Sequence, residues 1–203
     1  MSPEEFQADT GADAVTMARL AAYAELLVKW QARINLVGPD TLPTLWRRHM
    51  LDSAQLLPLL PPGARRLVDL GSGAGFPGLV LAIMGAPDVH LVESDARKAA
   101  FLREAARVAE TPVTVHVGRI ESLAPLAADI VTARALAPLS RLLPWAARHL
   151  AEGGVCLFLK GRGSEDELTE ARKEWIIAEE RAASRTDPSG VILQIREVRR
   201  GRN

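Results

Sequence analysis

The sequence predicts an α/β protein with a mostly parallel, doubly wound sheet. Two observations lead to this prediction. From Arg66 onward, short apolar runs alternate with segments of helical character, a pattern typical of parallel strands covered by helices on both faces. The first of these runs, Leu67–Leu70, is followed at once by a cluster of glycines, as in sheets that bind a ligand at their carboxyl edge.

The first third of the chain reads as helical. Apolar residues recur near the 3.6-residue period between Ala14 and Ala32, and a second helix is expected over Leu42–Leu59. Pro61-Pro62-Gly63 then interrupts the helical pattern. A chain of 203 residues suits one domain with an extension. We therefore expect an N-terminal helical extension over residues 1–63 and the α/β domain over residues 64–203, joined as one compact unit.

The elements of the α/β part follow from its apolar runs and turns. Expected strands cover residues 67–70, 89–93, 113–117, 130–132, 154–159, 191–195 and 197–198. Expected helices cover residues 78–84, 97–109, 139–150 and 165–180. The last two strands follow the turn Asp187-Pro188-Ser189-Gly190 and are rich in β-branched residues, so they are expected to form an antiparallel edge.

Composition excludes several classes of protein. Hydrophobic residues make up 48% and charged residues 25%, which excludes a disordered or fibrous chain. The single cysteine, Cys156, rules out a disulfide framework and is expected in the core. No apolar stretch is long enough for a transmembrane helix, and the acidic N-terminus is unlike a signal peptide, so a cytoplasmic protein is expected. No residue cluster has metal-ligand spacing and nothing demands an oligomer, so we expect a metal-free monomer.

Charge is segregated along the chain, although the formal net charge is zero. Residues 29–66 carry six Lys or Arg against two Asp, and residues 181–203 carry six Arg against two acidic residues, so each segment has a net charge of +4. Arginine outnumbers lysine by 21 to 4. Because arginine suits forked phosphate contacts and base stacking, the pattern favours a nucleic-acid partner. The codon usage of a GC-rich genome explains the arginine excess equally well.

The glycine-rich segment 69–78 is the most informative part of the sequence. Its glycines allow a tight turn and let a ligand touch the backbone, as in proteins that bind NAD or S-adenosylmethionine. The carboxylate of Asp69 would repel a pyrophosphate but would favour the sulfonium and ammonium groups of S-adenosylmethionine. The spacing Asp69-x-Gly71-x-Gly73-x-Gly75 is also the usual loop of class I methyltransferases. Glu93 ends the second strand, where an acid accepts the ribose hydroxyls of either cofactor.

With S-adenosylmethionine as donor, the sequence limits the acceptor atom. Methylation of pyrimidine C5 needs a nucleophilic cysteine, and Cys156 is expected in the core. Methylation of an exocyclic amine commonly uses Asp/Asn-Pro-Pro-Tyr/Phe after the fourth strand, and residues 132–139 lack that motif. An acceptor that is already nucleophilic remains, such as guanine N7, which needs only in-line positioning at ~3–3.5 Å.

Three side chains are candidates for positioning the substrate. Arg134 follows the fourth strand at the carboxyl edge of the sheet and is the leading candidate, with a plain surface arginine as the alternative. Lys160 follows the fifth strand beside glycines and suits a phosphate contact. His49 could face the substrate, although a packing role suits it equally well.

Several segments together resemble a known family. They are Asn35-Leu36-Val37, Arg48-His49-Met50-Leu51-Asp52-Ser53, Leu70-Gly71-Ser72-Gly73-Ala74-Gly75-Phe76-Pro77-Gly78, Glu93-Ser94-Asp95-Ala96-Arg97-Lys98, Arg134-Ala135, Pro138-Leu139 and Leu159-Lys160-Gly161. In this combination the sequence closely resembles the bacterial 16S rRNA guanine-N7 methyltransferases, also called glucose-inhibited division protein B. The resemblance implies a class I, Rossmann-like, S-adenosylmethionine-dependent methyltransferase. It also implies in-line methyl transfer to N7 of a guanine in the small-subunit rRNA, near the decoding site.

The resemblance extends to individual residues. Positions that match the family's cofactor contacts are Gly71, Phe76, Glu93, Ile120, Glu121 and Arg134, with Ile120-Glu121 at the adenine. Together with Asp69, Gly73 and Gly75 they make up the expected S-adenosylmethionine site, and Arg134 is the expected catalytic residue. Expected contacts to 16S rRNA or the small ribosomal subunit are Arg47, Arg48, His49, Lys160, Arg199 and Arg200.

Three rival functions remain at this point. A small-molecule methyltransferase would share the fold but would need no basic rim. A non-catalytic module that binds S-adenosylmethionine or RNA would have no use for Asp69, the glycine loop, Glu93 and Arg134 together. An NAD-dependent oxidoreductase would need a proton-transfer residue after the later strands, where none is evident.

Overall fold

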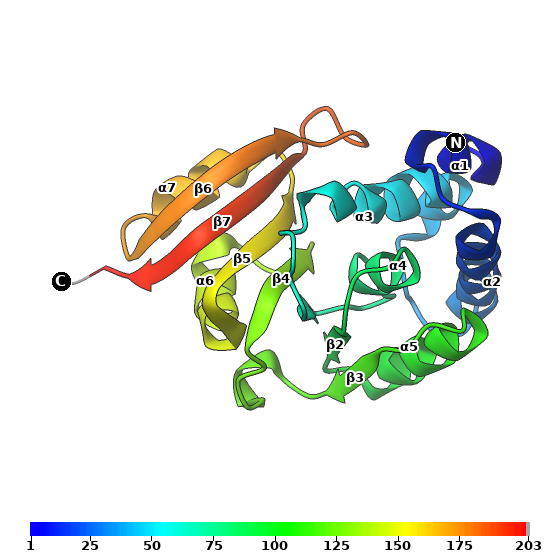
Figure 1. Cartoon of the computed structure of the whole chain (residues 1–203), viewed down its shortest axis with the longest axis horizontal. Coiled ribbons are helices and arrows are strands. Elements are labelled where there is room, and N and C mark those ends of the chain that lie inside the picture. Colours follow the sequence, from blue (N-terminus) through cyan, green and yellow to red (C-terminus); the bar gives the residue numbers. More distant parts are fainter. Residues whose placement is uncertain (202–203) are drawn as a thin grey trace.

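The structure is a computed structural model that describes residues 1–201. A seven-stranded sheet fills its centre, with the N-terminal helices at one end and a long β-hairpin at the other (Figure 1). The strands are β1 (Leu67–Leu70), β2 (Val89–Glu93), β3 (Thr114–Val117), β4 (Ala128–Arg134), β5 (Leu150–Lys160), β6 (Trp175–Ala183) and β7 (Val191–Arg200). The helices among them are α4 (Gly78–Ile83), α5 (Ala96–Val108), η4 (Ile120–Ser122), α6 (Leu139–His149) and α7 (Ser164–Ala171).

The strand order across the sheet is β3-β2-β1-β4-β5-β7-β6. Strands β1 to β5 run parallel, and β7 pairs antiparallel with both β5 and β6. The predicted α/β class, parallel sheet and antiparallel edge are therefore confirmed. Between β1 and β4 the order of strands reverses. Open α/β sheets bind ligands outside the carboxyl ends of the strands at such a point.

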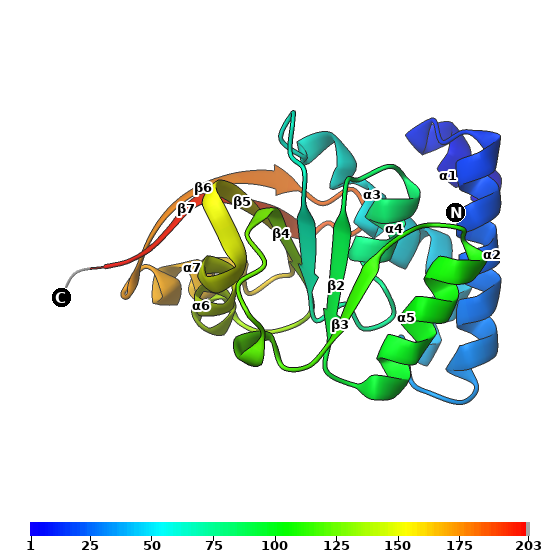
Figure 2. The same cartoon turned by 60° about the horizontal axis from the view of Figure 1, so that its bottom comes forward.

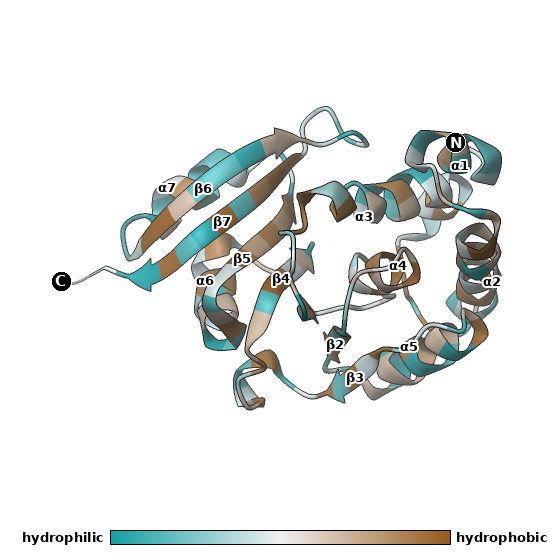
Figure 3. Cartoon of the chain, viewed as in Figure 1, coloured by the Kyte–Doolittle hydropathy of each residue, from teal (hydrophilic) through white to brown (hydrophobic). Residues whose placement is uncertain are grey.

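Alternate residues of the central strands face opposite sides of the sheet. In β1, Leu67 belongs to the apolar core shared with α2, α4 and α5, whereas Val68 belongs to the core shared with α6 and α7. Figure 2 shows α5 and α2 on one side of the strands and α6 and α7 toward the other. Strand β5 is apolar along its buried half, unlike the exposed strand β6 (Figure 3). Cys156 of β5 is fully buried, as predicted, and burial raises the pKa of its thiol.

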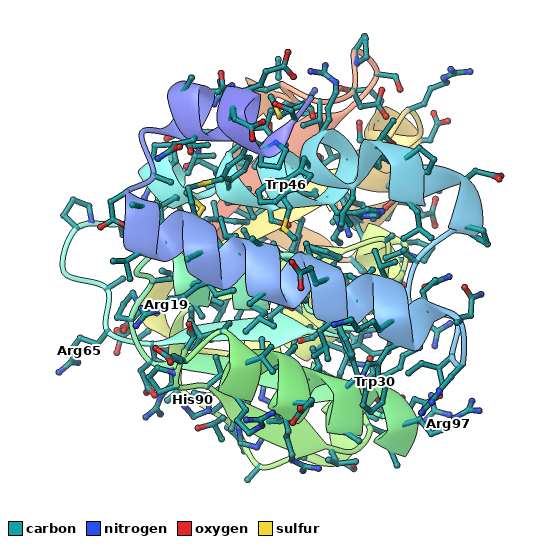
Figure 4. The ribbon with its side chains drawn as sticks, turned by 90° about the vertical axis from the view of Figure 1, so that its right-hand side faces the viewer. Arg19, Trp30, Trp46, Arg65, His90 and Arg97 are labelled. Atoms are coloured by element: carbon teal, nitrogen blue, oxygen red, sulfur yellow. The ribbon has the colours of Figure 1, made fainter. Side chains whose placement is uncertain are left out.

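The N-terminal helices pack onto this sheet through α5. Helix α1 (Pro3–Thr10) begins with a capping box between Ser2 and Glu5 and was not expected from the apolar pattern. Helix α2 (Ala14–Gln31) lies between α1 and α5, where Trp30 meets Phe101 of α5 with ring centroids 5.6 Å apart (Figure 4). Four short turns then lead to β1, namely η1 (Pro39–Thr44), the π-helical turn η2 (Trp46–Leu51), α3 (Asp52–Ala54) and η3 (Leu57–Leu59).

The structure corrects two expected helices. Residues 42–59 do not form one α-helix, because a 3-10 turn ends at Thr44, a π-helical turn covers Trp46–Leu51, and Pro58, which lacks the N–H group that a continuous helix needs, lies in another 3-10 turn. The helix expected over residues 165–180 ends at Ala171, and β6 begins at Trp175. There, β-branched Ile176 and Ile177 and pairing with β7 outweigh the helix propensity of the neighbouring Ala and Glu residues. The two strands expected at 191–195 and 197–198 are one strand, β7.

Candidate active site

A cavity of about 630 Å³ opens at the carboxyl ends of the central strands. Its lining comes from the turns before β1, the glycine loop, the ends of β2, β4 and β5, the loop after β3, helices α5 and α6, and the loop between β6 and β7. Among the residues expected in the site, those that line it are Arg48, His49, Gly71, Gly73, Phe76, Glu93, Ile120, Glu121, Arg134 and Lys160. The parallel strands therefore bring together most of the expected cofactor residues.

The glycine loop has a backbone conformation that residues other than glycine adopt only with strain. Gly71 and Gly73 have φ angles of 65° and 54°, in the left-handed region. A Cβ atom on Gly71 would also lie 2.4 Å from Cδ1 of Leu136. Gly75 does not line the cavity; a Cβ there would lie 2.9 Å from the hydroxyl oxygen of Tyr23. This tyrosine, from α2, donates a hydrogen bond to the carbonyl oxygen of Ala74 and so supports the loop from behind.

Glu93 is fixed at the end of β2 by backbone donors. One carboxylate oxygen accepts a hydrogen bond from the amide of Gly73 at 2.8 Å, and the other accepts one from the amide of Asp95 at 2.7 Å. A carboxylate has about four acceptor positions, so capacity remains for hydroxyl donors in the cavity. The next loop is tied to the same strand end, because the amide of Gly118 donates to the carbonyl oxygen of Glu93. Ile120 and Glu121 of this loop then line the adjoining wall.

Asp69 lies behind the glycine loop rather than in the lining of the cavity, so its expected role at the cofactor stays a prediction. It is fully buried in β1, and one carboxylate oxygen accepts a hydrogen bond from the hydroxyl of Thr132 at 2.7 Å. Its other carboxylate oxygen has no hydrogen-bond partner among the described residues. The side chain points toward α4, because a Cβ on Gly78 would lie 2.6 Å from Cβ of Asp69. Burial raises the pKa of the Asp69 carboxyl to about 6.

Arg134 is held at the end of β4 by three acceptors. Its Nη1 donates to the carbonyl oxygen of Arg48 and to a carboxylate oxygen of Asp52, both at 3.1 Å. Its Nη2 donates to Nδ1 of His49 at 2.8 Å. The guanidinium carbon lies 5.0 Å from the centre of the Phe76 ring. A guanidinium has five N–H groups, so two remain for a group in the cavity.

His49 lines the cavity and engages both ring nitrogens within the protein, which favours the packing role over the contact with RNA. Its ring stacks on Phe76 with centroids 4.9 Å apart, and its Nε2 lies 2.7 Å from the hydroxyl of Thr41. Burial, together with the nearby charges of Arg134 and Arg48, lowers the pKa of His49 to about 3. The imidazole is therefore neutral at physiological pH and accepts at Nδ1. It belongs to a π-helical turn, a feature that occurs often at functional sites.

The other basic residues expected in the site fall into two groups. Lys160 lines the cavity but forms an ion pair with Glu167 at 2.6 Å, and Arg48 lines it from an exposed position. Arg47 lies outside the lining and donates to the carbonyl oxygen of Arg185 at 3.1 Å. The structure does not bring Arg199 and Arg200 to the cavity: they lie at the far end of β7 and pair with Glu197 and Glu174. Arg202, also counted in the basic tail, lies outside the described residues.

Sequence reasoning missed several residues of the cavity. Asp52 belongs to a segment that resembles the family, but the sequence alone assigned it no role. In the structure it forms an ion pair with Arg134 at 3.1 Å and so helps to hold the guanidinium. Arg141 and Trp145 of α6 also line the cavity. Their spacing of one helical turn in the helix after Arg134 was a signal that could have found them.

Comparison with known proteins identifies the family. Over residues 16–190 the chain matches the family model GidB, rRNA small subunit methyltransferase G. The chain belongs to this family. It is 72% identical to the ribosomal RNA small subunit methyltransferase G of Paramagnetospirillum magneticum, over 100% of this chain and 98% of that protein. It is 58% identical to the protein of the same name from Rhodospirillum rubrum, over 98% of this chain and 100% of that one.

Solved structures support the fold of the family member. The TehB-like SAM-dependent methyltransferase from Corynebacterium glutamicum is 15% identical, with a TM-score of 0.60 over 88% of this chain and 99% of that one. TYW2 from M. jannaschii, solved in complex with AdoMet, is 14% identical, with a TM-score of 0.60 over 84% of this chain and 80% of that one. The predicted Rossmann-like methyltransferase fold is therefore confirmed.

Two further observations concern metal binding and membrane-spanning helices. Among residues 1–201, no group of three or more His, Cys, Asp and Glu side chains is arranged to hold a metal ion. Within the same residues, no helix is long and apolar enough to cross a membrane.

Proposed function

We propose that this protein transfers a methyl group from S-adenosylmethionine to N7 of a guanine in the 16S rRNA, near the decoding site of the small ribosomal subunit. The observation that carries the proposal is family membership over residues 16–190, because the relatives at 72% and 58% identity are named ribosomal RNA small subunit methyltransferases. Methyl transfer to rRNA follows from this membership. The proposal adds the acceptor atom, the base that carries it and the location of that base in the rRNA. We also propose that the protein acts as a metal-free monomer in the cytoplasm.

S-adenosylmethionine is the cofactor, and the cavity has the chemistry to hold it. When bound, it supplies an electrophilic methyl group on a positively charged sulfur. The acceptor capacity of Glu93 suits the two hydroxyls of its ribose. The backbone at Gly73 is open to close approach, because a Cβ there would have only the carbonyl oxygen of Gly71 within 4 Å, and Ile120 and Glu121 flank the space suited to an adenine. The buried carboxylate of Asp69 ties β1 to β4 through Thr132 beneath the loop.

The surroundings of Arg134 favour an acceptor that needs no deprotonation. The nitrogens of His49 and the carboxylate of Asp52 are occupied by hydrogen bonds within the protein, so neither is a free base. Cys156 is fully buried in β5 and unavailable as a nucleophile. Guanine N7 has a lone pair in the plane of the ring and meets this condition.

Arg134 then acts by positioning. Guanine presents O6 beside N7, and arginine donates well to O6. The two N–H groups of Arg134 that remain can hold O6 while N7 stays free. The guanidinium itself is fixed by Asp52, His49 and the Phe76 ring. Holding the acceptor and the methyl group in line at ~3–3.5 Å is the catalytic contribution that such a site can make.

The proposal is tested by supplying labelled S-adenosylmethionine with two substrates in parallel. One substrate is small ribosomal subunits from cells that lack this methylation. The other is the mixture of small molecules extracted from the same cells. Label in the 16S rRNA, lost in Arg134→Ala while rRNA affinity is largely retained, is the expected result. Label confined to the small molecules would contradict the proposal and favour a small-molecule methyltransferase.

A further inference from the structure

The arginines of the β6–β7 hairpin (residues 175–200) pair with carboxylates of the protein, and Arg185 at its tip pairs with Asp9 of α1 at 2.6 Å. Arg181 pairs with Glu165 and Glu179, and Arg196 approaches Glu180 at 3.6 Å. The pairs of Arg199 and Arg200 complete the series. The positive charge that the sequence concentrates in this tail is therefore largely balanced within the protein. A hairpin of this kind offers little net attraction to a polyanion.

Basic residues without such partners gather at the mouth of the cavity. Arg48, Lys98, Arg119 and Arg141 all line it. Within residues 1–201, none of these four has a carboxylate oxygen within 4.0 Å. Arg48, Arg119 and Arg141 are also exposed. Because positive charge without a partner attracts phosphate over some distance, the mouth of the cavity, rather than the hairpin, is the part of the site that suits RNA.

One tryptophan stands among these cations. Trp145 of α6 is half-buried and lines the cavity, and the guanidinium carbon of Arg141 lies 5.3 Å from the centre of its ring. Two other tryptophans pack against phenylalanines, Trp30 on Phe101 and Trp46 on Phe6. In α6, Arg148 donates from Nε and Nη2 to the carbonyl oxygen of Leu123 at 3.1 and 2.8 Å. This contact fixes α6 beside the loop that carries Arg119.

A guanine that is stacked in a helix would have to leave it to react at N7. In A-form RNA the major groove, where N7 lies, is too deep and narrow for side chains to reach. Enzymes that modify such bases take them out of the stack and must compensate for the lost stacking of the neighbours. Aromatic rings and arginine planes supply that compensation for single-stranded RNA.

We propose that Arg119, Arg141 and Trp145 form an RNA-binding rim of the active site. In this rim, Arg141 and Trp145 stack with an unpaired base next to the target guanine, and Arg119 contacts the phosphate backbone. The inference rests on the proposed function and deepens it, because it assigns the single-stranded RNA to one wall of the cavity. It also moves the RNA contact away from Arg199 and Arg200.

The test compares three double variants that each remove two positive charges. Arg119→Ala/Arg141→Ala removes cations of the rim. Arg199→Ala/Arg200→Ala removes the paired cations of the hairpin. Arg65→Ala/Arg103→Ala is the matched control, because both residues are exposed and outside the cavity, with Arg65 projecting from the loop before β1 (Figure 4). Affinity for protein-free 16S rRNA is measured over a range of salt concentrations, with S-adenosylmethionine affinity measured separately.

The rim variant is expected to bind rRNA about tenfold more weakly, as when one base no longer stacks on the protein, and to keep its cofactor affinity. Its plot of log affinity against log salt is expected to be shallower by about 0.7 for each phosphate that the variant no longer binds. The other two variants are expected to bind like the wild type. An equal loss of rRNA affinity in all three variants, or a loss confined to the hairpin variant, would overturn the proposed rim.

Trp145 is tested separately because its inner side packs against the core. Trp145→Phe keeps an aromatic face, whereas Trp145→Leu gives an apolar side chain closer in size to phenylalanine but without that face. A raised KM for rRNA in the leucine variant, with the phenylalanine variant near the wild type, is expected. Weakened cofactor binding with unchanged rRNA affinity would instead assign Trp145 to the cofactor and overturn the proposal. Failure of the proposed function can be distinguished from failure of the rim, because the wild-type protein itself would then leave rRNA unlabelled.

Discussion

Asp52 is the residue on which three parts of the active site meet. One carboxylate oxygen accepts from Arg134 at 3.1 Å, and the other accepts from Gln55 at 3.0 Å and from the hydroxyl of Thr186 at 2.5 Å. It is largely buried, so its negative charge faces Arg134 with little screening by water. Asp52 thus joins the π-helical turn, the β6–β7 loop and the end of β4.

We expect Asp52→Asn to lower kcat by about tenfold or more while S-adenosylmethionine affinity stays near the wild type, because an amide holds the guanidinium less firmly than a carboxylate does. Steady-state kinetics on rRNA, with calorimetry of cofactor binding, measures both. Thr186→Val is the control that removes one partner of Asp52 and leaves its charge on Arg134. A KM effect alone in Asp52→Asn would show that Asp52 acts on binding rather than on positioning.

Asp69 should make stability depend on pH. Burial raises its pKa from 3.8 to about 6 in the folded protein, so the folded state holds the proton more tightly than the unfolded state. The stability that this proton brings is present below pH 3.8 and is lost as the pH rises through 6. Between pH 4 and pH 7, the wild type should therefore lose about 2 kcal/mol of unfolding free energy relative to Asp69→Asn.

Denaturant titrations of the two proteins across this pH range provide the measurement. The comparison cancels the other titrating groups, His49 among them, because both proteins contain them. A constant difference between wild type and Asp69→Asn would mean that the Asp69 carboxyl titrates as it does in the unfolded chain.

At the scale of elements, the glycine loop depends on backbone shape. Gly71 combines a φ of 65° with the nearby side chain of Leu136, so an alanine there is both strained and obstructed. We expect Gly71→Ala to weaken S-adenosylmethionine binding by about tenfold or more. Gly161→Ala is the matched control, because Gly161 lines the same cavity and a Cβ there would meet nothing within 4 Å. Similar weakening in both variants would refute the special role of Gly71.

The elements that sequence reasoning predicted well are those fixed by local pattern. The loop from Leu70 to Gly78 and the acid at Glu93 follow strands whose apolar runs are short and clear. The contact of Arg134 with His49 and Asp52 joins residues more than 80 positions apart, so no local pattern reveals it. Strand β6 was missed for a related reason, because its Ala and Glu residues favour helix until β7 pairs with it.

At the scale of the whole molecule, the N-terminal helices and the sheet share one core. Phe6, Leu20 and Tyr23 are fully buried in the same apolar cluster as Leu67 and Leu91 of the sheet. Tyr23 also supports the glycine loop through Ala74. The helical extension therefore serves the active site as well as the fold.

We expect a fragment of residues 64–203 to unfold without cooperativity, because removing residues 1–63 exposes one face of this core. Circular dichroism during thermal unfolding, beside the full-length protein, measures this. A fragment with a cooperative transition and intact cofactor binding would show two separable domains instead.

In the proposed reaction, one cavity delivers a methyl group to N7 of an rRNA guanine. The most direct measurement incubates the protein and S-adenosylmethionine with unmethylated small-subunit rRNA, followed by borohydride–aniline treatment, which cleaves RNA at N7-methylguanine. We expect one new cleavage in the 16S rRNA, absent with Arg134→Ala. Methyl incorporation without cleavage would contradict N7 as the acceptor, and cleavage that persists in Arg134→Ala would contradict the role of Arg134.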